Sequence, residues 1–103
     1  MAVMLSKFQR RDTADRVALG TAAFELCKQQ RAVPGVTASR FFWTSADDIA
    51  ILAEAESPLA FDEPMKPELA TAVFRLADLA LQTANERWTD PREGVSVHTR
   101  AGR

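Results

Sequence analysis

The chain has 103 residues, a formal net charge of -1, and a composition of 47% hydrophobic and 26% charged residues. This length and mixture fit one globular domain and exclude a disordered chain. The charge gives no global basic field for nucleic acid, and no apolar stretch has the length of a membrane span. We therefore expect one α+β domain over 1–103, with 98–103 as a flexible tail, and neither a nucleic-acid nor a membrane partner.

The one cysteine, Cys27, excludes an internal disulfide and is typical of a reducing compartment. The N-terminal segment MAVMLSKFQRR has no charged region before an apolar run, so it does not resemble a secretory signal. Together these features predict a cytoplasmic protein.

Residues 10–35 are predicted to form the first helix. Asp12 or Thr13 is suited to cap its start, because short polar side chains accept hydrogen bonds from the first free backbone N–H groups. One stripe at helical spacing contains Val17, Phe24, Cys27 and Arg31, and it is broadened by Leu19, Ala23 and Leu26, so we expect this side of the helix to be buried.

Residues 36–57 are predicted to form a hairpin, in which two apolar runs flank the polar turn TSADD. A two-residue tip pairs Trp43 with Ala50, and a three-residue tip shifts this register by one. With the two-residue tip, Trp43 and Glu54 share one face, and Arg40 lies on the other.

A proline-rich segment then precedes a second, longer helix, predicted at 66–88 with Pro67 in its first turn. This range places Asn85 and Trp88 on the helix. Residues 94–100 alternate apolar and polar side chains, as a short final strand does.

With a first strand at 2–8, the element order is strand, helix, strand, strand, helix, strand. This is the ferredoxin-like β-α-β-β-α-β pattern, a four-stranded antiparallel sheet with both helices on one face. One face of the hairpin carries Phe42 and Ile51. The other carries Trp43 and Leu52, so both faces are apolar, although a sheet with one wet face should alternate. We expect a second copy of the chain to cover the second face, giving a homodimer.

Element order, length and the doubly apolar hairpin resemble the dimeric α+β barrel superfamily, which includes the antibiotic-biosynthesis-type monooxygenases. The resemblance covers nearly the whole chain as a pattern of elements. It implies a dimer whose sheets face each other, with a pocket inside the barrel or between sheet and helices. It also implies a cofactor-free monooxygenase or a haem-handling enzyme that uses Asn, Trp and His around a hydrophobic pocket. Trp43 and His98 lie on expected strands, whereas Asn85 does not.

Four residues are candidates for binding a ligand: Arg40, Trp43, Glu54 and His98. Arg40 either anchors an anion or pairs with an acid such as Glu54. Trp43 either stacks on a flat ligand or packs in the core. His98 is a general base, a haem ligand or an exposed residue, and Glu54 is a base or an exposed edge residue. Cys27 is expected to be a small core residue.

The sequence shows no metal-ligand spacing and no glycine-rich phosphate loop, so we expect no metal and no cofactor. One function requires no motif that the sequence lacks: a small dimeric domain could bind an apolar or aromatic ligand or a protein partner. The enzyme implied by the resemblance is the alternative. A winged-helix regulator is a third reading, disfavoured because the second helix has no excess of basic residues.

Overall fold

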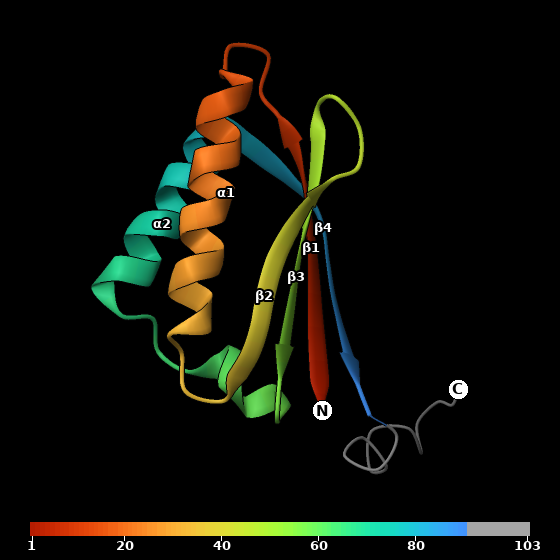
Figure 1. Cartoon of the computed structure of the whole chain (residues 1–103), viewed down its shortest axis with the longest axis vertical. Helices are drawn as coiled ribbons and strands as arrows, with labels where there is room; N and C mark the ends of the chain where they lie inside the picture. The colour runs from red at the N-terminus through yellow and green to blue at the C-terminus, as the bar shows by residue number, and fades with distance from the viewer. Residues whose placement is uncertain (91–103) are drawn as a thin grey trace.

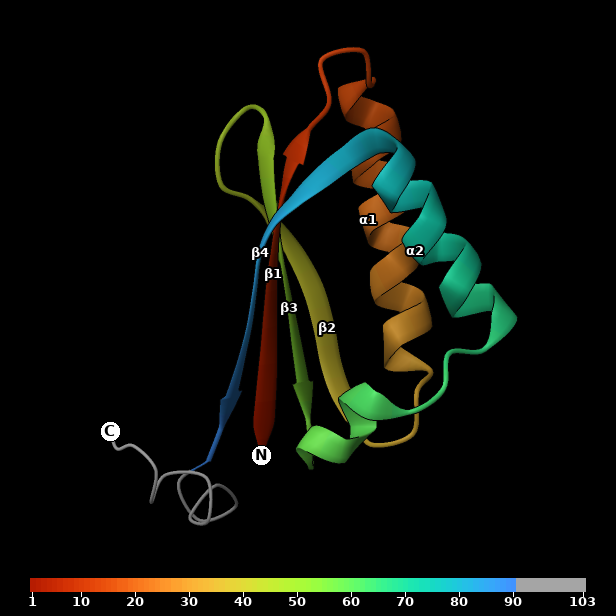
Figure 2. The same cartoon turned by 180° about the vertical axis from the view of Figure 1, so that it is seen from behind.

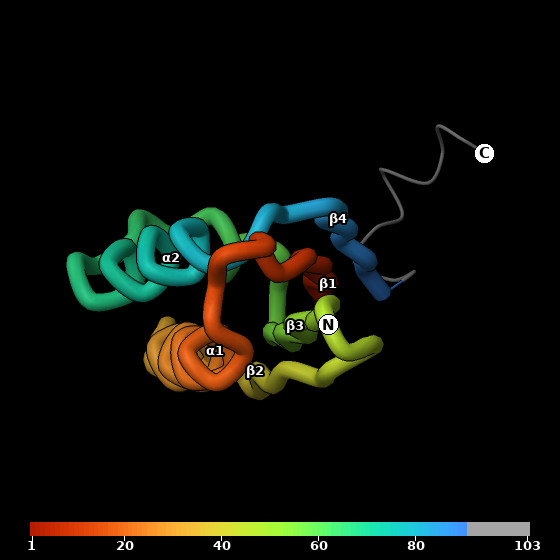
Figure 3. Tube along the Cα trace, turned by 90° about the horizontal axis from the view of Figure 1, so that it is seen from above, coloured from red at the N-terminus to blue at the C-terminus, as the bar shows by residue number. Residues whose placement is uncertain are grey.

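The computed structural model describes residues 1–90, and it has two layers, with both helices on one face of a four-stranded antiparallel sheet (Figures 1 and 3). The strand order across the sheet is β2-β3-β1-β4, which confirms the ferredoxin-like prediction. The predicted final strand at 94–100 and tail at 98–103 lie outside the described residues. In residues 1–90 no helix is long and apolar enough to cross a membrane. The elements are β1 Ala2–Arg10, α1 Arg16–Arg31, β2 Val36–Trp43, β3 Asp48–Ala55, the 3-10 helix η1 Pro58–Asp62, α2 Pro67–Leu79 and β4 Ala80–Thr89.

The β2–β3 hairpin has the three-residue tip, so the two-residue register was wrong. The backbone N–H of Thr44 donates to the carbonyl of Asp48 at 2.9 Å, which closes the tip. In this register Arg40 and Glu54 share one face of the sheet, and Trp43 lies on the opposite face. A one-residue shift has this effect because side chains alternate between faces along a strand.

Helix α1 begins later than the sequence predicted, because Asp15 is its N-cap. The Asp15 carboxylate accepts a hydrogen bond from the backbone N–H of Ala18 at 2.9 Å. The buried face is centred on Leu19, which is fully buried, whereas Val17 is 76% exposed and Phe24 is 59% exposed. The predicted stripe was therefore wrong for Val17 and Phe24, whereas its members Leu19, Ala23 and Leu26 are buried.

The second helix ends at Leu79, and the chain passes directly into strand β4, which pairs with β1. The prediction of a helix to residue 88 was wrong, and Asn85 and Trp88 lie on β4. No glycine marks this end. Instead, Arg11 binds the last carbonyls of α2, its backbone N–H donating to Leu79 O at 3.0 Å and its guanidinium to Ala77 O at 3.0 and 3.2 Å. A helix end needs such partners, and here they come from a distant loop.

The core fills the space between the helices and the sheet, with Leu19, Ile49 and Leu76 among its largest fully buried side chains. We call this side of the sheet the covered face and the opposite side the open face. Apolar side chains lie on the open face too: Phe42 is 49% exposed and Trp88 is 50% exposed. In the described chain no helix lies over the open face (Figure 1).

Candidate functional site

A cavity of about 340 Å³ lies between α2, η1 and the β1–β4 half of the sheet. Figure 2 shows why it forms there: α2 meets the sheet at its C-terminal end and diverges from it toward its N-terminal end, while η1 crosses beneath. Most of its lining is apolar. The larger apolar side chains are Met4, Phe8, Leu26, Val33, Val36, Phe61, Met65, Leu69, Val73 and Leu76.

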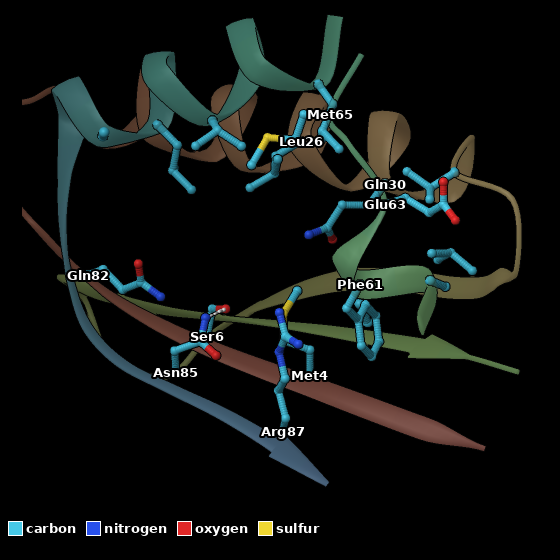
Figure 4. A pocket seen from close by; sticks show the side chains of 18 of the residues that line it. Met4, Ser6, Leu26, Gln30, Phe61, Glu63, Met65, Gln82, Asn85 and Arg87 are labelled. Carbon is cyan, nitrogen blue, oxygen red and sulfur yellow. Dashed lines mark hydrogen bonds between the residues drawn. The ribbon is translucent and has the colours of Figure 1, made fainter. Parts of the chain in front are cut away.

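A small set of polar side chains shares this cavity: Ser6, Gln30, Glu63, Gln82, Asn85 and Arg87. Asn85 Nδ2 on β4 donates to Ser6 Oγ on β1 at 3.3 Å (Figure 4). Ser6 is only 7% exposed, whereas Asn85 is exposed, so the polar pair runs from the cavity floor toward an opening beside β4. Such a pair can donate to or accept from one polar group of a ligand.

An irregularity in β4 brings Asn85 to the cavity. Phe8 pairs with Gln82 and Lys7 pairs with Ala84, so one extra residue, Thr83, is inserted into β4. Strict alternation from Gln82 would turn Asn85 to the open face. The bulge instead aims both amide side chains at the covered face, a known use of β-bulges beside binding sites.

An ion pair spans one end of the cavity. Arg87 Nη1 on β4 lies 2.8 Å from Asp62 Oδ1 at the end of η1. The Arg87 guanidinium also lies 5.8 Å from the ring centre of Phe61. Both ionic side chains are about half exposed, so the pair contributes little to stability. The ion pair matters locally, since Asp62 neutralises Arg87, the only arginine among residues 1–90 that lines the cavity.

Three of the four predicted site residues, Arg40, Trp43 and Glu54, do not line this cavity. Arg40 is exposed and Glu54 is half-buried, both on the open face, and neither lines the cavity. Trp43 packs against the core, with the Arg16 guanidinium 3.9 Å from its ring centre. His98 lies outside the described residues. A ligand-binding role for these four residues stays a prediction.

Cys27 is a buried core residue beside β2. Burial raises the pKa of its thiol, and a hydrogen bond with Ser39 and the charge of Arg31 oppose this only in part. The thiol is therefore neutral near neutral pH and is no nucleophile in the folded protein. Residues 1–90 contain no group of three or more His, Cys, Asp or Glu side chains that could hold a metal ion.

Sequence reasoning missed the polar side chains of the cavity. Asn85, Gln82 and Arg87 were assigned to a helix that ends before them. One available signal was the rarity of Asn85, the only asparagine of the chain. The bulge that aims it inward leaves no pattern in the sequence of β4.

Comparison with solved structures shows the same fold in other proteins. SnoaB, a cofactor-independent oxygenase of Streptomyces nogalater, matches with a TM-score of 0.76 and 11% identity, over 86% of this chain and 91% of that one. Rv0793 of Mycobacterium tuberculosis matches with a TM-score of 0.72 and 17% identity, over 86% and 93%. An antibiotic biosynthesis monooxygenase matches with a TM-score of 0.69 and 14% identity, over 87% and 97%.

These matches show that the chain shares its ferredoxin-like α+β fold with these proteins. At such low identities they show the fold alone, and a fold hosts many functions. Comparison of the sequence with protein-family models and with curated proteins finds no match.

Proposed function

We propose that this protein binds an apolar small molecule in the cavity between α2 and the β1–β4 half of the sheet. The observation that carries the proposal is the lining: large apolar side chains surround one polar pair, the buried Ser6 and the exposed Asn85. Ligand sites combine mostly apolar walls with a few placed polar groups, and the volume is within their usual range. The ligand is therefore a compact, ring-sized apolar molecule with at least one oxygen or nitrogen atom.

The test is to fill the cavity and measure binding. Val73 lines the cavity from α2, whereas its neighbour Phe74 on the same helix is 70% exposed and does not line the cavity. We expect native mass spectrometry to find a retained small molecule, or calorimetry to detect added fluorenone, in the wild type and in Phe74→Trp. Val73→Trp should bind neither. Equal binding by both variants would contradict the proposal.

A second candidate function is oxygenation of the bound molecule without a cofactor. Asn85 favours it, because this residue lies on strand β4 and lines the cavity, whereas the sequence predicted it on a helix. The likeness to SnoaB, a cofactor-independent oxygenase, supports it at the level of fold. The apolar walls would keep water from the substrate, and the Asn85 N–H would stabilise negative charge on a substrate oxygen.

Such a reaction needs a substrate that supplies its own electrons. An activated CH₂ group can react with O₂ to give a carbonyl and one water, so carbon is oxidised and O₂ is reduced without an external reductant. β-Tetralone, an enolisable bicyclic ketone, is a suitable probe. We expect O₂ uptake after treatment with a chelator, reduced about a hundredfold in Asn85→Leu. Uptake that requires added flavin, haem or metal would exclude this candidate.

We further propose that two copies of the chain associate through their open faces. Apolar side chains there include Val3, Leu5 and Leu52, which are half-buried, and the exposed rings of Phe42 and Trp88. A sheet face left in water is normally polar, and an apolar patch of this kind marks an interface. Light scattering at micromolar concentration should give twice the monomer mass, and a monomer would contradict the proposed dimer.

A further inference from the structure

The helix-side wall of the cavity carries a third amide, besides Gln82 and Asn85 on β4. Gln30 lies in the last turn of α1, is half-buried and lines the cavity from the helix layer. Figure 4 shows its side chain reaching from α1 into the space above the sheet, while Ser6 and Asn85 lie on the sheet below. The cavity therefore has polar groups on both of its walls.

A buried serine fixes the orientation of this amide. Ser39 on β2 is 3% exposed, and its hydroxyl donates to Gln30 Oε1 at 2.5 Å. Ser39 is itself held, because its carbonyl accepts a hydrogen bond from Arg31 Nη1 at 2.8 Å. One lone pair of the Gln30 amide oxygen is thus used by Ser39. Within residues 1–90 the Nε2 of Gln30 has no acceptor, so the N–H groups are left for the cavity.

We propose that Gln30 is a specificity-determining residue that donates an N–H to a neutral oxygen acceptor on the helix side of the ligand. This inference rests on the proposed ligand-binding function. A carbonyl or ether oxygen fits, because an uncharged amide does not compensate the burial of a carboxylate. A pure hydrocarbon would cover the N–H without replacing its water, at a cost of roughly tenfold in affinity.

Fluorenone and fluorene test this proposal, since they share a ring frame and differ in one carbonyl. The variant Gln30→Met removes the donor and keeps the length of the side chain. The matched control is Gln29→Met, because Gln29 is the next residue, bonds to Glu25 and lines the outer groove between the helices. Gln30→Glu is the second variant. Its carboxylate still accepts the hydrogen bond from the Ser39 hydroxyl, so this protein should fold even if Gln30→Met, which leaves buried Ser39 without an acceptor, does not.

We expect the wild type and Gln29→Met to prefer fluorenone by about tenfold, and both Gln30 variants to lose the preference while still binding fluorene. Ser39→Ala should reduce the preference, because Gln30 is then free to turn. If Gln30→Met and Gln30→Glu keep the preference and Asn85→Leu loses it, the role of Gln30 is overturned and ligand binding stands. If the wild type binds neither compound up to its solubility limit, both proposals fail.

Discussion

The two faces of the sheet are both apolar, yet only one is covered by helices within the described chain. Ile51 and Leu52 are neighbours on β3 and show the difference: Ile51 is 2% exposed under the helices, whereas Leu52 is half-buried on the open face. The covered face holds the core and the cavity, so we assign it ligand binding. Within residues 1–90 the open face has no second layer, and it is the face through which we propose that two copies associate. Substitutions on the two faces should therefore affect different properties.

The largest effect is expected from truncation on the covered face. Ile51→Ala should lower the free energy of unfolding by about 2–5 kcal/mol, because it leaves a cavity among well-packed neighbours. Leu52→Ala should cost less than about 1 kcal/mol in dilute protein, since its side chain is already half in water. Urea unfolding at several protein concentrations measures both. Equal losses at the lowest concentration would show that the two faces contribute equally to the core.

A charge on the open face is expected to break assembly and leave the fold intact. Leu52→Asp would bury an unpaired carboxylate between two sheets, which we expect to weaken the dimer at least about a hundredfold. Phe74→Asp is the control, because Phe74 is 70% exposed on α2 and away from this face. Light scattering should find a monomer only for Leu52→Asp, with fluorene binding retained. A persistent dimer would place the interface elsewhere.

A smaller effect is expected where the covering layer joins the sheet. Arg11→Ala removes the donors that bind Ala77 O at the end of α2, and it should cost about 1 kcal/mol, because the arginine is exposed. Arg75→Ala, an exposed arginine on the same helix, should change stability by less than about 0.5 kcal/mol. Urea unfolding compares the two. Equal losses would mean that Arg11 acts through charge and not through capping.

The contacts of Arg11 with the end of α2 illustrate which parts of the fold could be predicted from the sequence and which could not. The hairpin at 36–57 and the start of α2 at Pro67 are encoded locally, by turn residues, β-branched and aromatic runs and a proline at a helix start. The end of α2 is not. Residues 80–89 include many good helix formers, and they become a strand because β1 offers a free edge and Arg11 satisfies the helix end.

The candidate site could not be predicted for the same reason. Asn85 reaches the cavity only because β4 is a strand and because Thr83 is inserted into it. Gln30 was on the predicted first helix, but nothing in the sequence pairs it with Ser39. Both depend on the register between segments far apart in the chain, which residue periodicity does not specify.

The smallest effect is expected at the ion pair between Arg87 and Asp62 at one end of the cavity, where a charged ligand would interact with the charge of Arg87. Asp62→Asn frees Arg87 from its ion pair, and stability should change by less than about 0.5 kcal/mol because both side chains are about half exposed. Affinity for fluorenone carboxylate should rise about three- to fivefold at low salt, and the gain should fade at high salt. Uncharged fluorenone should bind as before.

Glu63→Gln is the matched control for this experiment. Glu63 also lines the cavity and its removal changes the net charge equally, but it makes no ion pair with Arg87 in the described chain. A gain confined to Asp62→Asn shows that Asp62 sets the preference for neutral ligands by occupying Arg87. The same gain in Glu63→Gln would mean that only the summed charge around the cavity matters. Then the covered face would select its ligand by the amides of Gln30 and Asn85 alone.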